Sequence, residues 1–262
     1  MTDGGLSALD IQSLADERGL AIDEVGIAGL RLPVRIVGDT ATPQSTVAEI
    51  AMNVDLDPTQ RGAHMSRFVE VLTSNEEALD AHVLGRIAQE LRRRLDSRRA
   101  SVALTFPYFL ERAAPITGGA ALVEYRGALR AEAAATLTLS VGARIPVASL
   151  CPCSKEISDY GAHNQRGYVD IDIDCRQGHT IAIDELIAVA EAAASAPVYA
   201  LLKRPDERFV TMQAYENPAF VEDIARDVAL ALRGDDRVER FAVTATNLES
   251  IHAHDVVATI RG

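Results

Sequence analysis

The segment Ser149-Leu150-Cys151-Pro152-Cys153-Ser154-Lys155-Glu156-Ile157-Ser158 runs on to Gly161-Ala162-His163-Asn164-Gln165-Arg166, between predicted strands at about 134–145 and 168–175. Two thiols flank a proline, and a histidine follows twelve residues after the first thiol. Thiolate and imidazole are preferred ligands of zinc and related metals. A single cysteine pair is weak evidence for a metal site, so the segment could equally be a solvated loop. Any further ligands must come from elsewhere in the chain.

The second half of the chain predicts a regular series of elements around this segment. Asn217 is a good N-cap for its last helix, and Pro218 suits the first helical position. A run of charged residues at 203–207 separates the two helices and is expected to be a loop. The strands are predicted at about 134–145, 168–175, 241–246 and 251–260, and the helices at about 183–194 and 218–232.

The first half repeats the same order. Its predicted helix, at about 75–99, has a face of apolar residues that step by four, and its C-terminal arginines suit a helix end better than a nucleic-acid patch. The same tripeptide also occurs in both halves, as Gly62-Ala63-His64 in the first and Gly161-Ala162-His163 in the second. Strands are predicted at about 25–37, 45–54, 101–109 and 120–128.

These patterns predict an α+β protein made of two similar modules. Each module would be an antiparallel four-stranded sheet with helices packed on one face. We place the modules at 23–130 and 131–262, behind a flexible leader at 1–22.

The composition limits the classes of function. The chain has 262 residues, of which 48% are hydrophobic and 24% charged, as in ordinary globular proteins. Its formal net charge of −12 argues against general binding to nucleic acid or to anionic membranes. We expect a cytoplasmic protein, because the chain shows no signal peptide, no apolar run of about 20 residues and only three cysteines.

Two histidines near the C-terminus are candidates for proton transfer. His252 and His254 are two residues apart in a predicted strand, so both should project from one face. With Asn247 and Glu249 close by, they could form an acid/base pair near neutral pH. The alternative is a strand end that simply faces solvent.

Other charged residues admit two interpretations. Glu207 lies in the charged run and is by itself typical of a solvated loop, and Glu222 could interact with the helix dipole and pair with Arg226.

The sequence contains neither a P-loop nor a GxGxxG motif for binding phosphate. A phosphate would instead meet the basic residues that cluster in these segments, which are Arg67, Lys155, Arg166, Lys203 and Arg204.

Taken together, these segments resemble the signature of the type B GTP cyclohydrolases I. The resemblance covers nearly the whole chain after about residue 23. The motifs that carry it are Gly62-Ala63-His64-Met65-Ser66-Arg67-Phe68, the 151–158 and 161–166 segments quoted above, Leu202-Lys203-Arg204-Pro205-Asp206-Glu207, Tyr215-Glu216-Asn217-Pro218 with Phe220-Val221-Glu222-Asp223, and Asn247-Leu248-Glu249-Ser250-Ile251-His252-Ala253-His254.

The resemblance implies the tunnelling fold, in which antiparallel sheets of several subunits close into a barrel with active sites at subunit interfaces. It implies a homotetramer or homodimer that converts GTP and water to 7,8-dihydroneopterin triphosphate and formate, the first step of tetrahydrofolate and pterin biosynthesis. It also implies one divalent metal ion per site, zinc, manganese or iron. The implied ligands are Cys151, His163 and Glu207, with Cys153 as the alternative thiol.

The resemblance also implies roles for the other candidates. Glu222, at the start of a helix, would anchor the purine, with Glu216 as its competitor. Cys151, Glu249, His252 and His254 would be catalytic, the two histidines as proton shuttles. His64, Arg67, Lys155, Arg166, Lys203 and Arg204 would contact the substrate.

Two other functions remain as alternatives. A 7-cyano-7-deazaguanine (nitrile) reductase of the same fold would use a cysteine nucleophile and NADPH. A non-catalytic assembly protein would use the metal only as a structural staple.

Overall fold

The computed structural model describes residue 12, residues 14–38 and residues 42–262. Residues 1–11 and residue 13 of the predicted leader lie outside this part. No helix within the described residues is long and apolar enough to cross a membrane.

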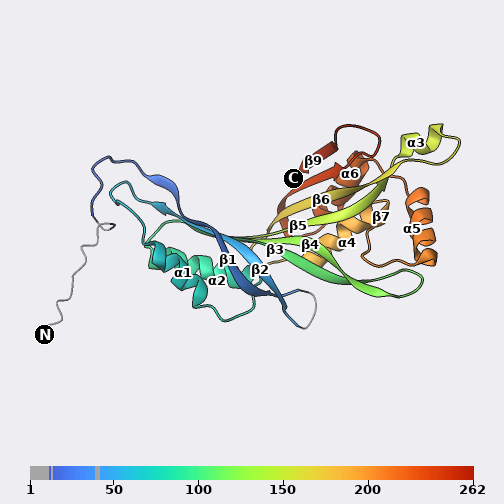
Figure 1. Cartoon of the computed structure of the whole chain (residues 1–262). Coiled ribbons are helices and arrows are strands. Elements are labelled where there is room, and N and C mark those ends of the chain that lie inside the picture. Colours follow the sequence, from blue (N-terminus) through green and yellow to red (C-terminus); the bar gives the residue numbers. More distant parts are fainter. Residues whose placement is uncertain (1–11, 13, 39–41) are drawn as a thin grey trace.

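Eight strands form one continuous antiparallel sheet in the order β1-β2-β3-β4-β5-β6-β8-β9, and the short β7 pairs beside β5 (Figure 1). Side chains alternate between a buried and a more exposed face along most of these strands, as a sheet with one covered face requires. The strands are β1 (Ile22–Ile36), β2 (Gln44–Leu56), β3 (Ala100–Ala113), β4 (Ala120–Ala133), β5 (Leu137–Leu150), β6 (Asn164–Cys175), β7 (Ala196–Pro197), β8 (Val238–Asn247) and β9 (Val256–Arg261).

The helices follow the second strand of each half. In the first half α1 and α2 connect β2 to β3, and in the second half α4, α5 and α6 connect β6 to β8. The short α3 lies in the β5–β6 connection. The helices are α1 (Met65–Thr73), α2 (Ala81–Arg94), α3 (Pro152–Ile157), α4 (Ile183–Ala193), α5 (Arg204–Glu216) and α6 (Val221–Arg233).

The predicted α+β class with antiparallel sheets is confirmed. Strands of the two halves join through the pairing of β4 with β5, so the chain carries one sheet instead of two separate ones. The core lies between this sheet and the helices, where α6 buries Ile224, Val228 and Leu232 and α2 buries Leu84 and Leu91. The module boundaries at 23–130 and 131–262 remain a prediction.

Several helices begin at residues other than the predicted ones, because local hydrogen bonds determine where each helix starts. The predicted helix at 75–99 begins only at Ala81, because the Asp80 carboxylate accepts a hydrogen bond from the Val83 N–H at 2.7 Å and caps it. A separate helix, α1, precedes it and was not predicted, since it has only nine residues. The helix predicted from Pro218 begins at Val221, where Asp223 accepts from the Phe220 N–H.

The segment before α6 also differs from the prediction. Asn217 is the C-cap of α5 instead of the N-cap of α6, and its side chain donates to the Ala194 carbonyl at 2.9 Å. The charged run predicted as a loop is the first turn of α5, with Pro205 near its start. Proline is tolerated there because the first N–H groups of a helix have no intrahelical partner.

Candidate active site

A cavity of about 220 Å³ lies where the end of β5, the start of β6 and the end of β8 meet the start of α6. It brings together six of the residues predicted to act, although they come from three distant parts of the sequence. These residues are Cys151, His163, Glu222, Glu249, His252 and His254.

Cys151 is placed by the start of α3. It is the N-cap of this short helix, Pro152 is the first helical residue, and the Cys151 sulfur accepts a hydrogen bond from the Ser154 N–H at 3.4 Å. Cys151 is partly buried and lines the cavity, whereas Cys153 is exposed and does not. The cavity therefore favours Cys151 over Cys153 as the thiol of the site.

His163 is held by backbone and side-chain contacts to the same turn. Its carbonyl accepts from the Cys151 N–H at 3.1 Å, and its N–H donates to the Ser154 hydroxyl at 3.1 Å. Gly161 has a φ of 120°, a conformation that suits glycine, where the chain turns back from α3 toward β6. His163 Nδ1 lies 2.9 Å from Gln165 Oε1 and 3.9 Å from Glu249 Oε2.

The wall behind the cavity is a buried hydrogen-bonded chain. The Asn247 amide donates to the Ser149 hydroxyl at 3.0 Å, and this hydroxyl donates to the Ala219 carbonyl at 3.1 Å. Ser149 and Asn247 are buried, so these bonds connect β8, β5 and the residues just before α6 in a low-dielectric setting. These hydrogen bonds fix the start of α6 and with it the position of Glu222.

Ser149 and Gln165 are site residues that the sequence reasoning did not identify. Both lie in the quoted cysteine–histidine segment, and both are polar residues at inward positions of strands. That alternation was a usable signal, since a buried polar side chain in a strand needs a specific partner.

The two C-terminal histidines differ from their prediction in one respect. β9 begins only at Val256, so His252 and His254 lie in an irregular exposed segment after β8. Their rings nevertheless stack, with centroids 5.2 Å apart and planes 21° from parallel. They meet through this stacking and not through strand alternation, and both line the cavity.

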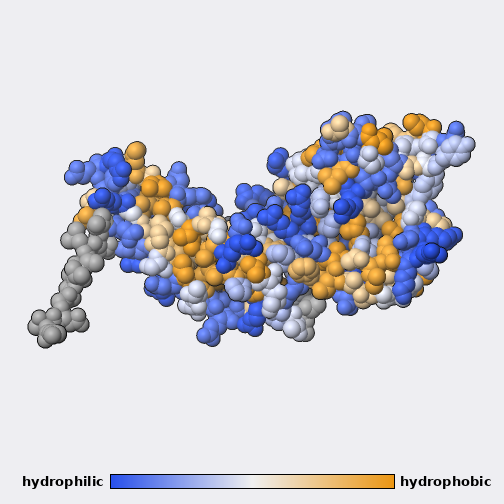
Figure 2. Space-filling view, in the orientation of Figure 1, coloured by the Kyte–Doolittle hydropathy of each residue, from blue (hydrophilic) through white to orange (hydrophobic). Residues whose placement is uncertain are grey.

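Three predicted residues on or near α5 lie outside this cavity. Lys203, Arg204 and Glu207 are exposed at the start of the helix, where hydrophilic side chains gather on the surface (Figure 2). Between them Asp206 is fully buried and accepts hydrogen bonds from the Ile116, Thr117 and Lys203 N–H groups and the Thr117 hydroxyl. Burial raises the pKa of Asp206, but these hydrogen bonds outweigh it and hold the pKa well below its usual range.

The other predicted substrate contacts are dispersed. Lys155 donates to the Tyr215 carbonyl at 2.6 Å and lies over the Tyr215 ring. His64 and Arg67 line a separate cavity of about 210 Å³ beside α1, at the opposite end of the molecule from α3 and α6 (Figure 1). Arg166 projects from β6 on the face of the sheet opposite Gln165. Within one chain these residues do not join the cavity.

The donor groups of the cavity fit part of a divalent metal site. A thiol and an imidazole face it, and an imidazole whose Nδ1 is held by an amide oxygen leaves Nε2 as a ligand atom. In the described part of the chain, however, no three His, Cys, Asp or Glu side chains converge closely enough to hold a metal. The assignment of Glu207 as third ligand remains a prediction.

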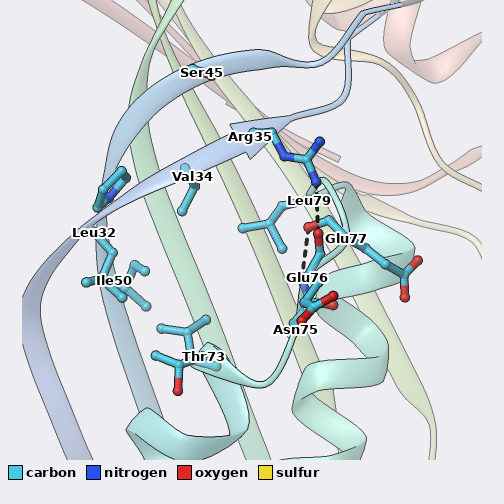
Figure 3. Close-up of a pocket in the computed structure, with 12 residues that line it drawn as sticks. Leu32, Val34, Arg35, Ser45, Ile50, Thr73, Asn75, Glu76, Glu77 and Leu79 are labelled. Carbon is cyan, nitrogen blue, oxygen red and sulfur yellow. Dashed lines mark hydrogen bonds between the residues drawn. The ribbon is translucent and has the colours of Figure 1, made fainter.

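A larger cavity, of about 420 Å³, lies in the first half between β1, β2 and the segment before α2 (Figure 3). Apolar side chains such as Leu32, Val34 and Leu79 line it, and Arg35 donates to the Glu76 carbonyl at 2.8 Å. Its walls contain no cysteine or histidine. This cavity is larger than the one that holds Cys151 and His163, but its lining lacks the reactive side chains that mark a candidate active site.

The sheet, its helices and the thiol–imidazole cavity together define a tunnelling-fold protein with an enzyme-like site. Solved structures share the fold: uricase from Arthrobacter globiformis aligns with a TM-score of 0.51 at 12% identity, covering 91% of this chain and 92% of that one. A urate oxidase mutant from Bacillus sp. TB-90 aligns at 0.52 and 9% identity, covering 92% and 99%. At such identities the likeness concerns the fold alone.

The sequence comparisons define the family. The family described as type I GTP cyclohydrolase folE2 matches residues 9–258. GTP cyclohydrolase FolE2 1 of Dechloromonas aromatica is 46% identical over 257 residues, covering 97% of this chain and 95% of the relative. GTP cyclohydrolase FolE2 of Neisseria gonorrhoeae is 45% identical over 252 residues, covering 96% and 97%. This chain belongs to the type I GTP cyclohydrolase folE2 family.

Proposed function

We propose that this chain is an enzyme that hydrolyses GTP to 7,8-dihydroneopterin triphosphate and formate, at the entry to tetrahydrofolate and pterin biosynthesis. The single observation that carries the proposal is the cavity of about 220 Å³ in which a thiol, three imidazoles and two carboxylates converge in a member of this family. A protein that only bound GTP would not need this density of groups able to move protons.

The residues of the cavity suit the bond changes of the reaction. Glu222 would accept hydrogen bonds from the N–H groups of guanine, a charge-assisted contact that orients the base. His252 and His254 would deliver protons as the imidazole ring of guanine opens. The Glu249 carboxylate, 3.9 Å from His163 Nδ1, would place negative charge beside the His163 side chain.

A divalent metal would be held by Cys151 and His163, with Glu207 as the third ligand that the family resemblance implies. When bound, such a metal lowers the pKa of water enough to supply a hydroxide nucleophile near neutral pH. Zinc, manganese and iron all accept this mixture of sulfur, nitrogen and oxygen donors.

We further propose that the active form is a homo-oligomer, a dimer or a tetramer. His64 and Arg67 lie at the far end of the chain from the cavity, so they could contact the same substrate only from a neighbouring copy (Figure 1). Arg67 would then add positive charge for the triphosphate in a protein whose net charge is −12.

The proposal is tested by incubating the purified protein with GTP and zinc, manganese or iron(II), each separately. We expect formate release together with the fluorescence of neopterin after oxidation. The absence of both products with every metal would overturn the proposal.

The same preparation separates the two alternatives. A nitrile reductase would oxidise NADPH in the presence of 7-cyano-7-deazaguanine and release no formate from GTP. A non-catalytic assembly protein would dissociate or unfold on chelation, whereas Glu222→Ala and His252→Ala would leave its assembly unchanged.

A further inference from the structure

The sheet forks near the middle of β4. β4 pairs with β3 along its whole length, from Ala113↔Ala120 to Ala100↔Ala133, but with β5 only from Arg126↔Arg144 onward. Residues 120–125, the first half of β4, have no partner on β5. The end of β5 pairs instead with β7, through Val147↔Pro197 and Ala148↔Ala196. The fork encloses an open cleft of about 870 Å³.

Two arginines stand directly opposite each other where the fork begins. Arg126 and Arg144 are register partners on neighbouring strands, both are exposed, and both line the cleft. Like charges in this arrangement destabilise a sheet. Arg144 approaches Asp170 only to 3.7 Å, and Arg126 forms no ion pair with any residue that the structure describes.

Nearby arginines on the same face show a different pattern. Arg130, four residues along β4 from Arg126, pairs with Asp172 at 2.8 Å, and Arg240 pairs with Asp174 at 2.8 Å. These pairs neutralise the face outside the cleft. At the fork, by contrast, Arg126 and Arg144 share the charge of a single neighbouring carboxylate, Asp170, so this part of the face keeps an excess of positive charge.

A third arginine extends the positive charge along β6. Arg166 lines the cleft, exposed, two residues from Tyr168, whose ring lies under the Arg144 guanidinium at 4.5 Å. The register places Arg166 opposite Ala148, four residues beyond Arg144, which is about 13 Å along the strand. One carboxylate, Glu124, lines the same cleft. Three guanidinium groups at this spacing match an extended anion better than a compact one.

We propose that the fork cleft, with Arg126, Arg144 and Arg166, binds a chain of phosphate groups. Guanidinium groups bind phosphate through two parallel N–H···O bonds, and a bound polyanion would relieve the repulsion between Arg126 and Arg144. The apolar walls contributed by Pro146, Val198 and Leu202 would exclude part of the water from these bonds.

This site is distinct from the active cavity of the same chain. Arg166 and Ala148 line the cleft, while their neighbours Gln165 and Ser149 line the active cavity. Adjacent residues of a strand point to opposite faces, so the sheet separates the two sites. The phosphate chain would come either from a nucleotide seated in a neighbouring subunit or from a separate phosphorylated molecule.

The test is isothermal titration of the full-length protein with inorganic triphosphate, which requires no catalytic step. We expect R126Q/R144Q to weaken binding by about tenfold or more, and R130Q, on the same face but outside the cleft, to leave it unchanged. Inorganic phosphate should bind more weakly than triphosphate. Equal binding by wild type and R126Q/R144Q, with both shown to be folded by circular dichroism, would overturn the proposal, as would no binding to wild type.

A competition experiment then identifies the source of the phosphate chain. If triphosphate inhibits GTP hydrolysis competitively, and R126Q/R144Q abolishes this inhibition, the cleft receives the tail of the substrate. If triphosphate binds without competing, the cleft takes a separate phosphorylated molecule. Either result supports the site, and failure of the proposed GTP hydrolysis would leave the titration unaffected.

Discussion

The Nδ1 atom of His163 lies 2.9 Å from the Oε1 atom of Gln165, a side chain that is buried in the wall of the candidate active cavity. An amide oxygen only accepts hydrogen bonds, so this contact assigns the proton of the neutral imidazole to Nδ1. Nε2 then has a lone pair for a metal ion, and the Gln165 side chain fixes the direction in which that lone pair points.

Replacing Gln165 with alanine should therefore weaken binding of the divalent metal about 10- to 100-fold, because the His163 ring loses its orienting partner. The affinity is measured by competition with a chromophoric chelator. The matched control is Asn164→Ala, an exposed position next in the same strand, which should bind as wild type. Unchanged affinity in Gln165→Ala would contradict this role.

Cys151→Ala should abolish metal retention and GTP hydrolysis without unfolding the protein. Cys151 lines the cavity, and the substitution removes its sulfur and leaves a methyl group that cannot ligate, whereas Cys153 is exposed and lies outside the cavity. Cys153→Ala should retain both properties. Metal content by mass spectrometry and the formate yield decide between the thiols, and the reverse result would make Cys153 the ligand.

Glu222→Gln should lower kcat/KM for GTP about 10- to 100-fold, since the neutral amide loses the charge-assisted bonds to the guanine N–H groups. Glu216→Gln serves as the control, because Glu216 ends α5 and does not line the cavity. Steady-state kinetics with GTP measure both. A larger loss in Glu216→Gln would exchange the two assignments.

Replacing either His252 or His254 with asparagine should lower kcat by about 10²- to 10⁴-fold, the range typical of a lost general acid or base. The pH dependence of kcat should also lose one limb. The stacked rings form one unit, so the double variant should be little worse than the worse single variant. Additive losses would show that the two imidazoles act independently.

Asp206→Asn should destabilise the protein at neutral pH, because the Asp206 carboxylate accepts hydrogen bonds that connect the start of α5 to the β3–β4 turn. The pKa of Asp206 is lowered in the folded state, so its contribution is present above the unfolded pKa of about 4 and is lost as the pH falls below it. Thermal melts of both proteins at pH 7 and at acidic pH measure this. The difference in Tm should shrink on acidification, and a constant difference would contradict the ionised role.

Several parts of the fold could be predicted because they depend on local periodicity. Alternating residues marked all of the long strands, and the four-residue steps of the α2 face and the α6 face located those helices. The boundaries of the helices could be predicted less accurately than their existence. They depend on individual hydrogen bonds, such as the Asp80 cap of α2 and the Asn217 contact to Ala194, which join residues that no periodic pattern marks.

The candidate site, too, could be predicted only in part from the sequence. The residue types and the 151–163 spacing pointed to a thiol and an imidazole near each other, and the structure places Cys151 and His163 on one cavity. The sequence could not indicate that Gln165 orients His163. It also could not indicate that Glu207 would face outward while the adjacent Asp206 is buried.

The sequence by itself determined the class of fold, the two-part order of strands and helices, and the chemical character of the site, because these follow from patterns within a few residues of each other. Only the tertiary structure decided that residues 149–165, 219–222 and 247–256 share one cavity, and that Arg126 meets Arg144 at the fork of the sheet. Such contacts depend on strand order and register, which are set by packing between segments about a hundred residues apart and leave no local signature.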